Sequence, residues 1–360
     1  MIPERLSRLR REMEQRHIDV YVVPTADFHE SEYVGAHFKA RSYITGFTGS
    51  AGTAIITMTE AGLWTDARYF LQAKRQLENT GVTLYRMGEE CVPTIMEYLR
   101  SALPEGGTLG FDGRVINARL GAAFLALAEE KHGKLAVGED LIGIIWDGRP
   151  ELPHAPVRIL TAEYSGRSTA DKLADVRAEM KKQGATVHLL TSLYDIAWLL
   201  NVRGGDIDYV PVVLSYLALT EEKCLWFVQD AILTPELRAY LAENRIETRL
   251  YESFYDYAAA IPAGETVLLD KGVCNYRLVS ELRDGVHTVD ETNPSVLMKS
   301  VKNETEQKNT VNAHQGRRRR DEVYLLAQEE HRQGADDRAL RLRLSRRAPR
   351  RSGGLPGSQL

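Results

Sequence analysis

Hydrophobic residues near the start of the chain recur at the spacing of one helix face. Leu6, Leu9 and Met13 lie three and four residues apart, and charged residues fill most positions between them. This pattern predicts an amphipathic helix. Residues 18–23 then form a short run rich in β-branched side chains that ends at Pro24, as expected of a strand. A helix that leads into such a strand is typical of an α/β domain.

The same helix pattern returns 167 residues later. Five positions match at this constant offset, namely Leu6 with Leu173, Leu9 with Val176, Arg10 with Arg177, Glu12 with Glu179 and Met13 with Met180. An apolar run at 187–190 again follows the helix. The repeat predicts two similarly built α/β lobes, and a length of 360 residues independently favours two domains over one.

Further elements alternate along both lobes. The first lobe is expected to contain strands at 53–58 and 61–65 and a helix at 67–79. The second is expected to contain helices at 194–201 and 234–244 and strands at 209–219, 223–228 and 266–270. Such alternation predicts the α/β class, with a mixed β-sheet flanked by helices in each lobe.

A linker is predicted between the two lobes. Residues 147–156 contain three prolines and one glycine, which favours an extended connection. We therefore place the first domain at 1–150 and the second at 157–300.

The segment 315–360 differs in composition from the rest of the chain. It contains twelve arginines, six acidic residues and no lysine, whereas all twelve lysines lie in 1–314. If the sequence is taken as written, this segment is expected to be a disordered basic tail. A functional alternative is a nucleic-acid-binding segment or a nuclear localisation signal. A back-translation of 316–360 can be chosen so that reading it one base later gives balanced charge and helical apolar spacing. We favour a frameshift near His314, which the nucleotide sequence tests.

The overall composition limits which binding partners and which cellular compartment are expected for this protein. The net charge of −4 is small, which predicts no nucleic-acid or membrane partner. No run approaches the ~18 apolar residues of a membrane span, and the charged first residues lack the apolar stretch of a secretory signal. The three cysteines, Cys91, Cys224 and Cys274, are widely scattered, which argues for a reducing compartment. We expect a cytoplasmic protein.

Four segments together resemble the three-domain Xaa-Pro aminopeptidases, whose first two domains are creatinase-N-like. They are 29–33 (HESEY) with 41–54 (RSYITGFTGSAGTA), 63–73 (LWTDARYFLQA), 145–150 (IWDGRP), and 195–204 (DIAWLLNVRG) with its continuation through Asp206 and Pro211 to Tyr216. The similarity runs from about residue 5 to 314. Residues 299–306 (KSVKNETE) resemble the start of the helix that leads into the family's catalytic domain, so 301–314 are expected to begin that domain.

The resemblance implies metal-dependent removal of an N-terminal residue that precedes proline. In the family, two divalent metals, usually manganese, are held by residues of the third domain. None of those ligands matches a residue here, so we expect no catalytic residue, no metal ligand and no cofactor in this chain, and no turnover as it stands. The family acts on peptides with proline in second position. A second copy of the chain is a further candidate partner, in a homo-oligomer. The alternatives are a non-catalytic dimerisation or peptide-binding module, and a hydrolase with an unrecognised site.

Arg41 is the single candidate substrate-binding residue. The resemblance implies that an arginine in this stretch reaches the active site of a neighbouring subunit, and the alternative is a structural salt bridge. Asp66 and Arg68 could form an active pair, but Asp66 suits a helix N-terminus better, because its carboxylate would accept from free backbone N–H groups.

Two other segments suggest sites that we disfavour. His29, Glu30 and Glu32 include metal-ligating residue types, but strand alternation would place them on opposite faces, so we expect local hydrogen bonding. The glycine-rich residues 46–52 are not followed by Gly-Lys-Ser/Thr, so a phosphate loop is disfavoured. A tight strand-to-strand turn is expected there instead.

Overall fold

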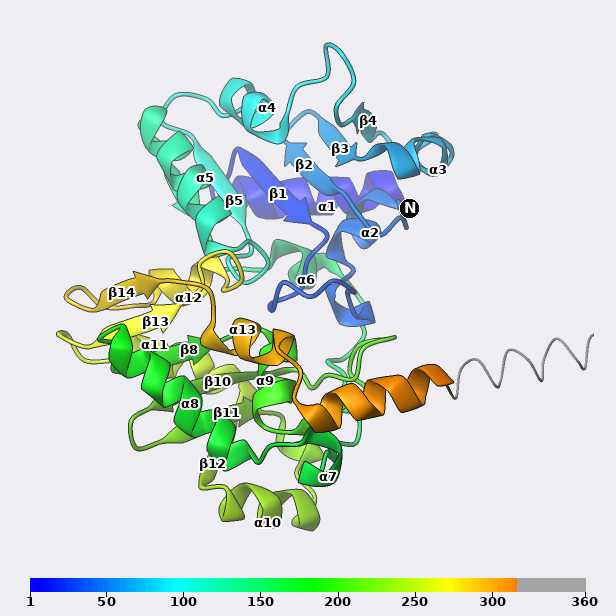
Figure 1. Ribbon diagram of the computed structural model, residues 1–360. Helices are drawn as coiled ribbons and strands as arrows, with labels where there is room; N and C mark the ends of the chain where they lie inside the picture. Colours follow the sequence, from blue (N-terminus) through cyan, green and yellow to red (C-terminus); the bar gives the residue numbers. More distant parts are fainter. Residues whose placement is uncertain (316–360) are drawn as a thin grey trace, which may run out of the picture. The chain divides into compact units, whose positions relative to one another are not determined.

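The computed structural model describes residues 1–315 (Figure 1). It divides into two compact units, residues 1–301 and a second unit that begins at Lys302. The first unit contains two six-stranded mixed sheets flanked by helices, which confirms the predicted α/β class. Apart from residue 315, the predicted tail and its alternative reading frame lie outside the described residues.

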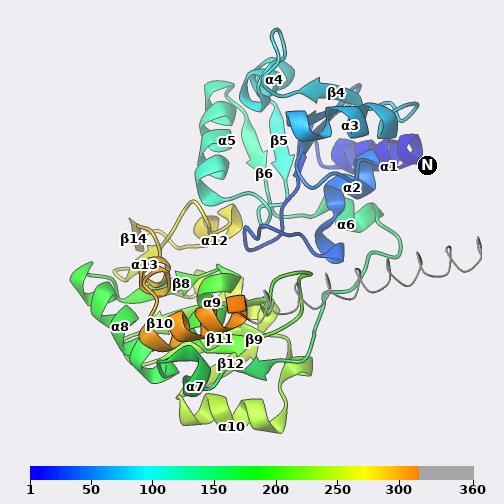
Figure 2. The same cartoon turned by 45° about the vertical axis from the view of Figure 1, so that its right-hand side comes forward.

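The first sheet has the strand order β4-β3-β2-β1-β5-β6. Its strands are β1 (Val20–Pro24), β2 (Thr53–Thr57), β3 (Ala61–Thr65), β4 (Thr83–Arg86), β5 (Thr108–Phe111) and β6 (Lys134–Ala136). Its helices are α1 (Ile2–Gln15), α2 (Ala40–Thr45), α3 (Phe70–Gln76), α4 (Ile95–Ala102), α5 (Ala118–Glu130) and α6 (Leu141–Ile145), with short 3-10 turns η1 (Ala36–Phe38) and η2 (Ala67–Tyr69). Helices α1 and α6 pack on one face of the sheet and α4 and α5 on the other (Figure 2).

The second sheet repeats this arrangement strand for strand, in the order β12-β11-β10-β8-β13-β14. Its strands are β8 (Val187–Leu190), β10 (Ser215–Thr220), β11 (Cys224–Val228), β12 (Ile246–Leu250), β13 (Thr266–Leu269) and β14 (His287–Asp290), and β7 (Arg158–Ile159) pairs separately with β9 (Val202–Arg203). The surrounding helices are α7 (Ala162–Ser165), α8 (Thr169–Lys182), α9 (Leu193–Leu199), α10 (Pro235–Glu243), α11 (Phe254–Ala259), α12 (Tyr276–Ser280) and α13 (Pro294–Ser300), with turns η3 (Asp230–Ile232) and η4 (Tyr251–Ser253). In each sheet one strand, β2 in the first and β10 in the second, runs antiparallel to both of its neighbours, and the remaining pairs are parallel.

The repeated residues of α1 and α8 occupy matching places. The three apolar positions of each helix are buried against its own sheet: Leu6, Leu9 and Met13 in α1, and Leu173, Val176 and Met180 in α8. Arg10 Nε donates to the Thr57 carbonyl at 2.9 Å, and Arg177 Nε donates to the Thr220 carbonyl at 2.8 Å. Each arginine therefore ties its helix to the end of the equivalent strand.

Two sequence expectations were wrong in detail. Residues 46–52 connect helix α2 to strand β2 rather than two strands, and Gly46 ends the helix with a φ of 79°, a left-handed conformation that glycine adopts without strain. The strand predicted at 209–219 begins only at Ser215. The residues before it form an irregular connection that includes Pro211, which has no N–H group for a sheet ladder.

The two lobes meet through equivalent loops. Residues 112–117 and 270–275 follow β5 and β13, share the sequence Asp-x-x-Val-x-Asn, and end in asparagines that cap α5 and α12. Their backbones exchange reciprocal hydrogen bonds, namely Ala118 N to Cys274 O and Tyr276 N to Ile116 O, and Arg119 N to Lys271 O and Arg277 N to Gly113 O, at 2.7–3.1 Å. The contact thus has local two-fold character.

Apolar side chains of the first lobe also enter the core of the second. Phe28, Phe38 and Ala118 belong to the buried cluster that contains the inner residues of β8, β10 and β13. Burial of apolar surface stabilises such a contact by about 25 cal/mol per Å². The lobes are therefore joined by side-chain packing as well as by the paired loops.

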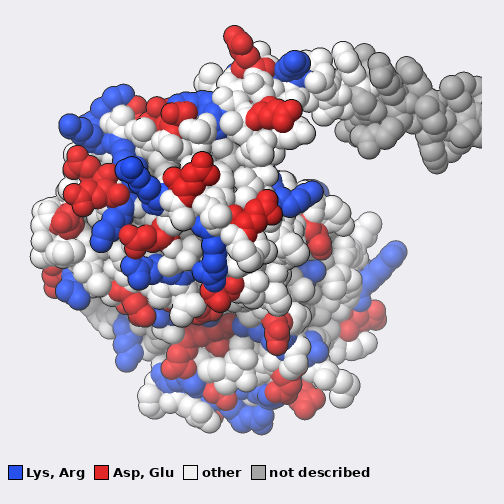
Figure 3. Space-filling view, turned by 90° about the horizontal axis from the view of Figure 1, so that it is seen from below, with Lys and Arg blue, Asp and Glu red and all other residues white. Residues whose placement is uncertain are grey.

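The second unit contributes a helix at 304–315. Asn303 Oδ1 accepts from Glu306 N, and Glu306 Oε2 accepts from Asn303 N, which is the reciprocal arrangement of a capping box. No helix among the described residues combines the length and the apolar character that crossing a bilayer requires. On the face shown in Figure 3, basic and acidic side chains are interspersed.

Candidate functional site

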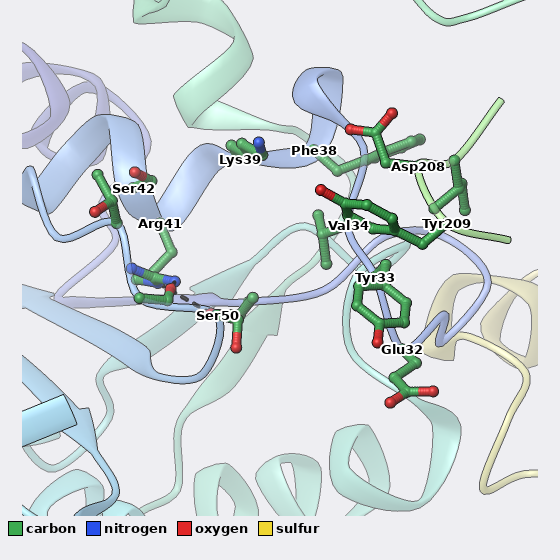
Figure 4. Close-up of a pocket in the computed structure, with 14 residues that line it drawn as sticks. Glu32, Tyr33, Val34, Phe38, Lys39, Arg41, Ser42, Ser50, Asp208 and Tyr209 are labelled. Atoms are coloured by element: carbon green, nitrogen blue, oxygen red, sulfur yellow. Dashed lines mark hydrogen bonds between the residues drawn. The ribbon is translucent and has the colours of Figure 1, made fainter. Parts of the chain in front are cut away.

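A pocket of about 360 Å³ opens beside the Arg41 segment (Figure 4). It is lined by residues that connect β1 to β2 in the first lobe and by three residues that connect β9 to β10 in the second. The lining residues are Thr25, Glu32, Tyr33, Val34, Phe38, Lys39, Arg41, Ser42, Thr48, Gly49, Ser50, Ile207, Asp208 and Tyr209. The pocket therefore brings together segments more than 150 residues apart in the sequence.

Arg41 lies at one end of this pocket and is almost fully buried, with 3% of its surface exposed. Its guanidinium donates to Thr25 Oγ1 at 3.0 Å and to the carbonyl oxygens of Phe47 and Gly49. Burial lowers the pKa of Arg41 to about 10, so the group stays charged at neutral pH. Among the described residues Arg41 makes no salt bridge, so the structural alternative takes another form, a clamp on the 46–50 loop.

Tyr209 lies at the opposite end, in a strained turn. Its φ is 70°, a region that bulky side chains rarely adopt, and 90% of its surface is exposed. The buried carboxylate of Asp206 restrains this segment, because it accepts from Ala155 N at 2.7 Å and from Leu214 N at 2.8 Å. Burial raises the pKa of Asp206. The sequence marked Asp206 within a motif but gave no signal for Tyr209.

The pocket has ends of different chemistry, as Figure 4 shows. Arg41, Ser42 and Ser50 lie on one side, and the Tyr33 and Tyr209 rings lie together on the other, with centroids 5.8 Å apart. Lys39 stands between the two groups. The acidic residues Glu32 and Asp208 belong to the tyrosine side, while Val34, Phe38 and Ile207 supply apolar wall.

His29 joins the lobes rather than lining the pocket. Its ring is buried, with Nδ1 2.9 Å from the Thr191 carbonyl and Nε2 2.7 Å from the Tyr251 hydroxyl. A carbonyl only accepts, so Nδ1 carries the proton and Tyr251 donates to Nε2. Burial lowers the pKa of His29. Residues 29–32 form a loop, so the strand alternation expected there was wrong. The backbone N–H of His29 donates locally to Asp27 Oδ1 at 2.9 Å, whereas its ring bonds to residues of the second lobe.

Asp66 caps the turn at the start of η2, as the sequence predicted. Its carboxylate accepts from Arg68 N at 3.0 Å and forms a two-pronged ion pair with the Arg68 guanidinium at 2.8–2.9 Å. The Arg68 side chain lowers the pKa of Asp66. Both groups are outside the pocket lining, which fits a structural role.

Two comparisons of sequence place the chain among known proteins. The family model described as the creatinase/prolidase N-terminal domain matches twice, at residues 5–138 and 148–306. The chain is 37% identical over 316 residues to a probable Xaa-Pro aminopeptidase P of Sordaria macrospora, across 84% of this chain and 51% of that protein. A probable Xaa-Pro aminopeptidase P of Talaromyces marneffei is 38% identical over 322 residues, across 86% and 49%.

A solved structure agrees with these matches. The crystal structure of X-prolyl aminopeptidase from Caenorhabditis elegans, a cytosolic enzyme with a di-nuclear active site, matches with a TM-score of 0.81 and 27% identity. The match covers 87% of this chain and 54% of that chain. The chain belongs to the creatinase/prolidase N-terminal domain family and contains two such domains.

The chain spans about half the length of the curated relatives that it matches. A di-nuclear metal site needs several carboxylate or imidazole ligands gathered around the ions. Within residues 1–315, no group of three or more His, Cys, Asp or Glu side chains is arranged to hold a metal. The residues described here therefore do not fit such a centre.

Proposed function

We propose that this chain is the non-catalytic N-terminal portion of an Xaa-Pro aminopeptidase and does not hydrolyse peptides by itself. The match to about half of each relative carries the proposal, and the misfit between residues 1–315 and a di-nuclear centre supports it. We place the domains at 1–150 and 157–300, with 301–314 as the start of the catalytic domain. The capped helix at 304–315 is compatible with that start.

In the intact enzyme, Arg41 would contribute to binding peptides that have proline in second position. Its place in the pocket lining supports this role. The guanidinium has five N–H groups, and three hydrogen bonds to the chain are formed, so donors remain for a carboxylate or carbonyl oxygen. Because these bonds also hold the loop, Arg41 would act both on the loop and on the peptide.

A turnover assay tests the proposal. The purified chain, supplied with manganese and an Xaa-Pro peptide, should release no N-terminal residue. Turnover that a chelator abolishes would show that the chain builds a metal centre of its own, and the proposal would be wrong. In an intact enzyme that contains this portion, Arg41→Lys should raise KM for the peptide more than it lowers kcat.

The second candidate function, a peptide-binding or dimerisation module, is favoured by the pocket. A concave site with apolar walls and a few convergent polar groups is typical of ligand sites.

We propose a cytoplasmic location, which the cytosolic relative from Caenorhabditis elegans supports. Size-exclusion chromatography of the chain tests whether it forms a homo-oligomer.

A further inference from the structure

The pocket beside Arg41 has the size and shape of a small-ligand site. Its volume of about 360 Å³ lies in the range of roughly 300–1,000 Å³ found for such sites. Its walls come from both lobes, which packing and paired loops hold together. Contacts between the two lobes therefore support the shape of the pocket.

The tyrosine side offers a flat apolar surface. Tyr33 and Tyr209 belong to different lobes, and both line the pocket with their ring centroids 5.8 Å apart. Exposed aromatic rings of this kind accept prolyl and other apolar side chains. Tyr209 holds its position despite a positive φ, and conformations of this type persist where the surrounding structure restrains them, often at ligand sites.

Charge is distributed unequally along the pocket. Arg41 carries positive charge at one end and Lys39 lies between the ends, whereas Glu32 and Asp208 carry negative charge on the tyrosine side (Figure 4). A ligand carboxylate is attracted to the first end and repelled from the second. A guanidinium is well suited to a carboxylate because its donors match the two oxygens.

We propose that this pocket binds the C-terminal end of a short peptide. The terminal carboxylate lies toward Arg41 and Lys39, and an apolar or prolyl side chain packs on the Tyr33–Tyr209 pair. The inference rests on the proposed peptide-binding role of Arg41 and adds the class of ligand, short peptides with a free carboxyl terminus. Such a site would make the intact enzyme favour short peptides over internal segments of long ones.

Calorimetric titration of the full chain with the dipeptide Pro-Phe tests the inference. This probe has no residue before its proline, so binding is measured without Xaa-Pro hydrolysis. Pro-Phe acid should bind roughly tenfold more tightly than its C-terminal amide, because the amide loses a charge-assisted contact. Tyr209→Ala should weaken binding about three- to tenfold, and Lys39→Ala should narrow the difference between acid and amide.

Leu71→Ala is the matched control, because Leu71 is 77% exposed and lies outside the pocket lining. It should leave the affinity unchanged. Equal affinity for acid and amide, no detectable binding at millimolar peptide, or equal losses in Tyr209→Ala and Leu71→Ala would overturn the inference. Because no turnover is measured, these outcomes are separate from those of the manganese assay, which tests the proposed function.

Discussion

The two lobes share one sheet topology but differ in the connection that follows the central strand. In the first lobe, β1 leads through residues 25–52 to β2, and in the second, β8 leads through 191–214 to β10. Both connections occupy the same place in the repeat, and both supply walls of the one pocket. The sheet topology is the same in both lobes while the equivalent connections differ, as expected when function is carried by loops on a rigid framework.

The two connections each contain a buried charge that is stabilised in a different way. Arg41 in the first connection is surrounded by neutral oxygens, whereas Asp195 in the second is paired with Lys299 and receives a hydrogen bond from Asn293. Lys299 and Asn293 belong to the segment that leaves the second lobe at α13. The second connection therefore ties down the exit of the lobe, while the first shapes the pocket.

The largest expected effect comes from Arg41→Ala. Loss of three hydrogen bonds from a buried cation, and the unpaired carbonyl oxygens left behind, should cost about 3 kcal/mol of unfolding free energy. Urea unfolding followed by circular dichroism measures this. Arg68→Ala is the control, because an exposed ion pair such as that of Arg68 with Asp66 contributes little to stability. Equal losses would contradict the assigned clamp.

Replacing the paired asparagines should reveal an asymmetry. Asn117→Ala and Asn275→Ala each remove a helix cap, which costs about 1 kcal/mol. Asn275 Nδ2 also donates to the Phe28 carbonyl at 2.9 Å and to the Tyr255 hydroxyl at 3.0 Å, so Asn275→Ala should cost about 1–2 kcal/mol more. Similar melting temperatures for the two variants would show that this bond between the lobes contributes nothing.

Acid should weaken both lobes through buried histidines. Burial lowers the pKa of His29, and lowers the pKa of His188 from 6.5 to about 4. Each histidine contributes stability that is fully present above about pH 6.5, the pKa of the group in the unfolded chain. That stability is lost as the pH falls through the lowered pKa of the folded state. The loss is up to about 1.4 kcal/mol for each pH unit by which folding lowers the pKa.

Unfolding measured between pH 7.5 and pH 4 checks this for two variants. His29→Gln and His188→Gln should each lose less stability on acidification than the native chain. Of these two histidines, only His29 bridges the lobes. Only His29→Gln should therefore make the dissociation of one lobe from the other less dependent on pH. A native chain whose stability does not change across this range would contradict both assignments.

Local patterns predicted the scaffold because they depend on residues close in sequence. Leu6, Leu9 and Met13 reveal one helix face, and the 167-residue offset reveals the second lobe. Helix α2 is only six residues long, too short to show a period, so the glycine-rich loop after it was assigned to the wrong pair of elements. The paired loops at 112–117 and 270–275 share the sequence Asp-x-x-Val-x-Asn. This similarity was present in the sequence, but it lies outside the two helices from which the repeat was predicted.

The pocket could not be predicted in the same way. A resemblance pointed to Arg41, but the pocket that Arg41 lines also includes Tyr209 from the other lobe, and only the folded chain brings both to one cavity. The positive φ of Tyr209 contradicts the strand that its aromatic ring favours by propensity. Asp206, which precedes the turn, accepts from Leu214 N on its far side and from Ala155 N of the linker, and these bonds restrain the turn.

The smallest expected effect tests the equivalence of the lobes. Arg10→Ala and Arg177→Ala each remove one guanidinium bond to a strand-end carbonyl, at 2.9 and 2.8 Å, and should each cost about 1 kcal/mol. Because the two bonds occupy matching places, the losses should agree within about 0.5 kcal/mol, and in the double variant they should add, since the sites are far apart in separate sheets. Urea titrations of the two single variants and the double variant measure these values. If one arginine variant loses clearly more unfolding free energy than the other, the two helices share a sequence pattern but contribute differently to stability. The equivalence of the lobes would then extend only to their backbone topology.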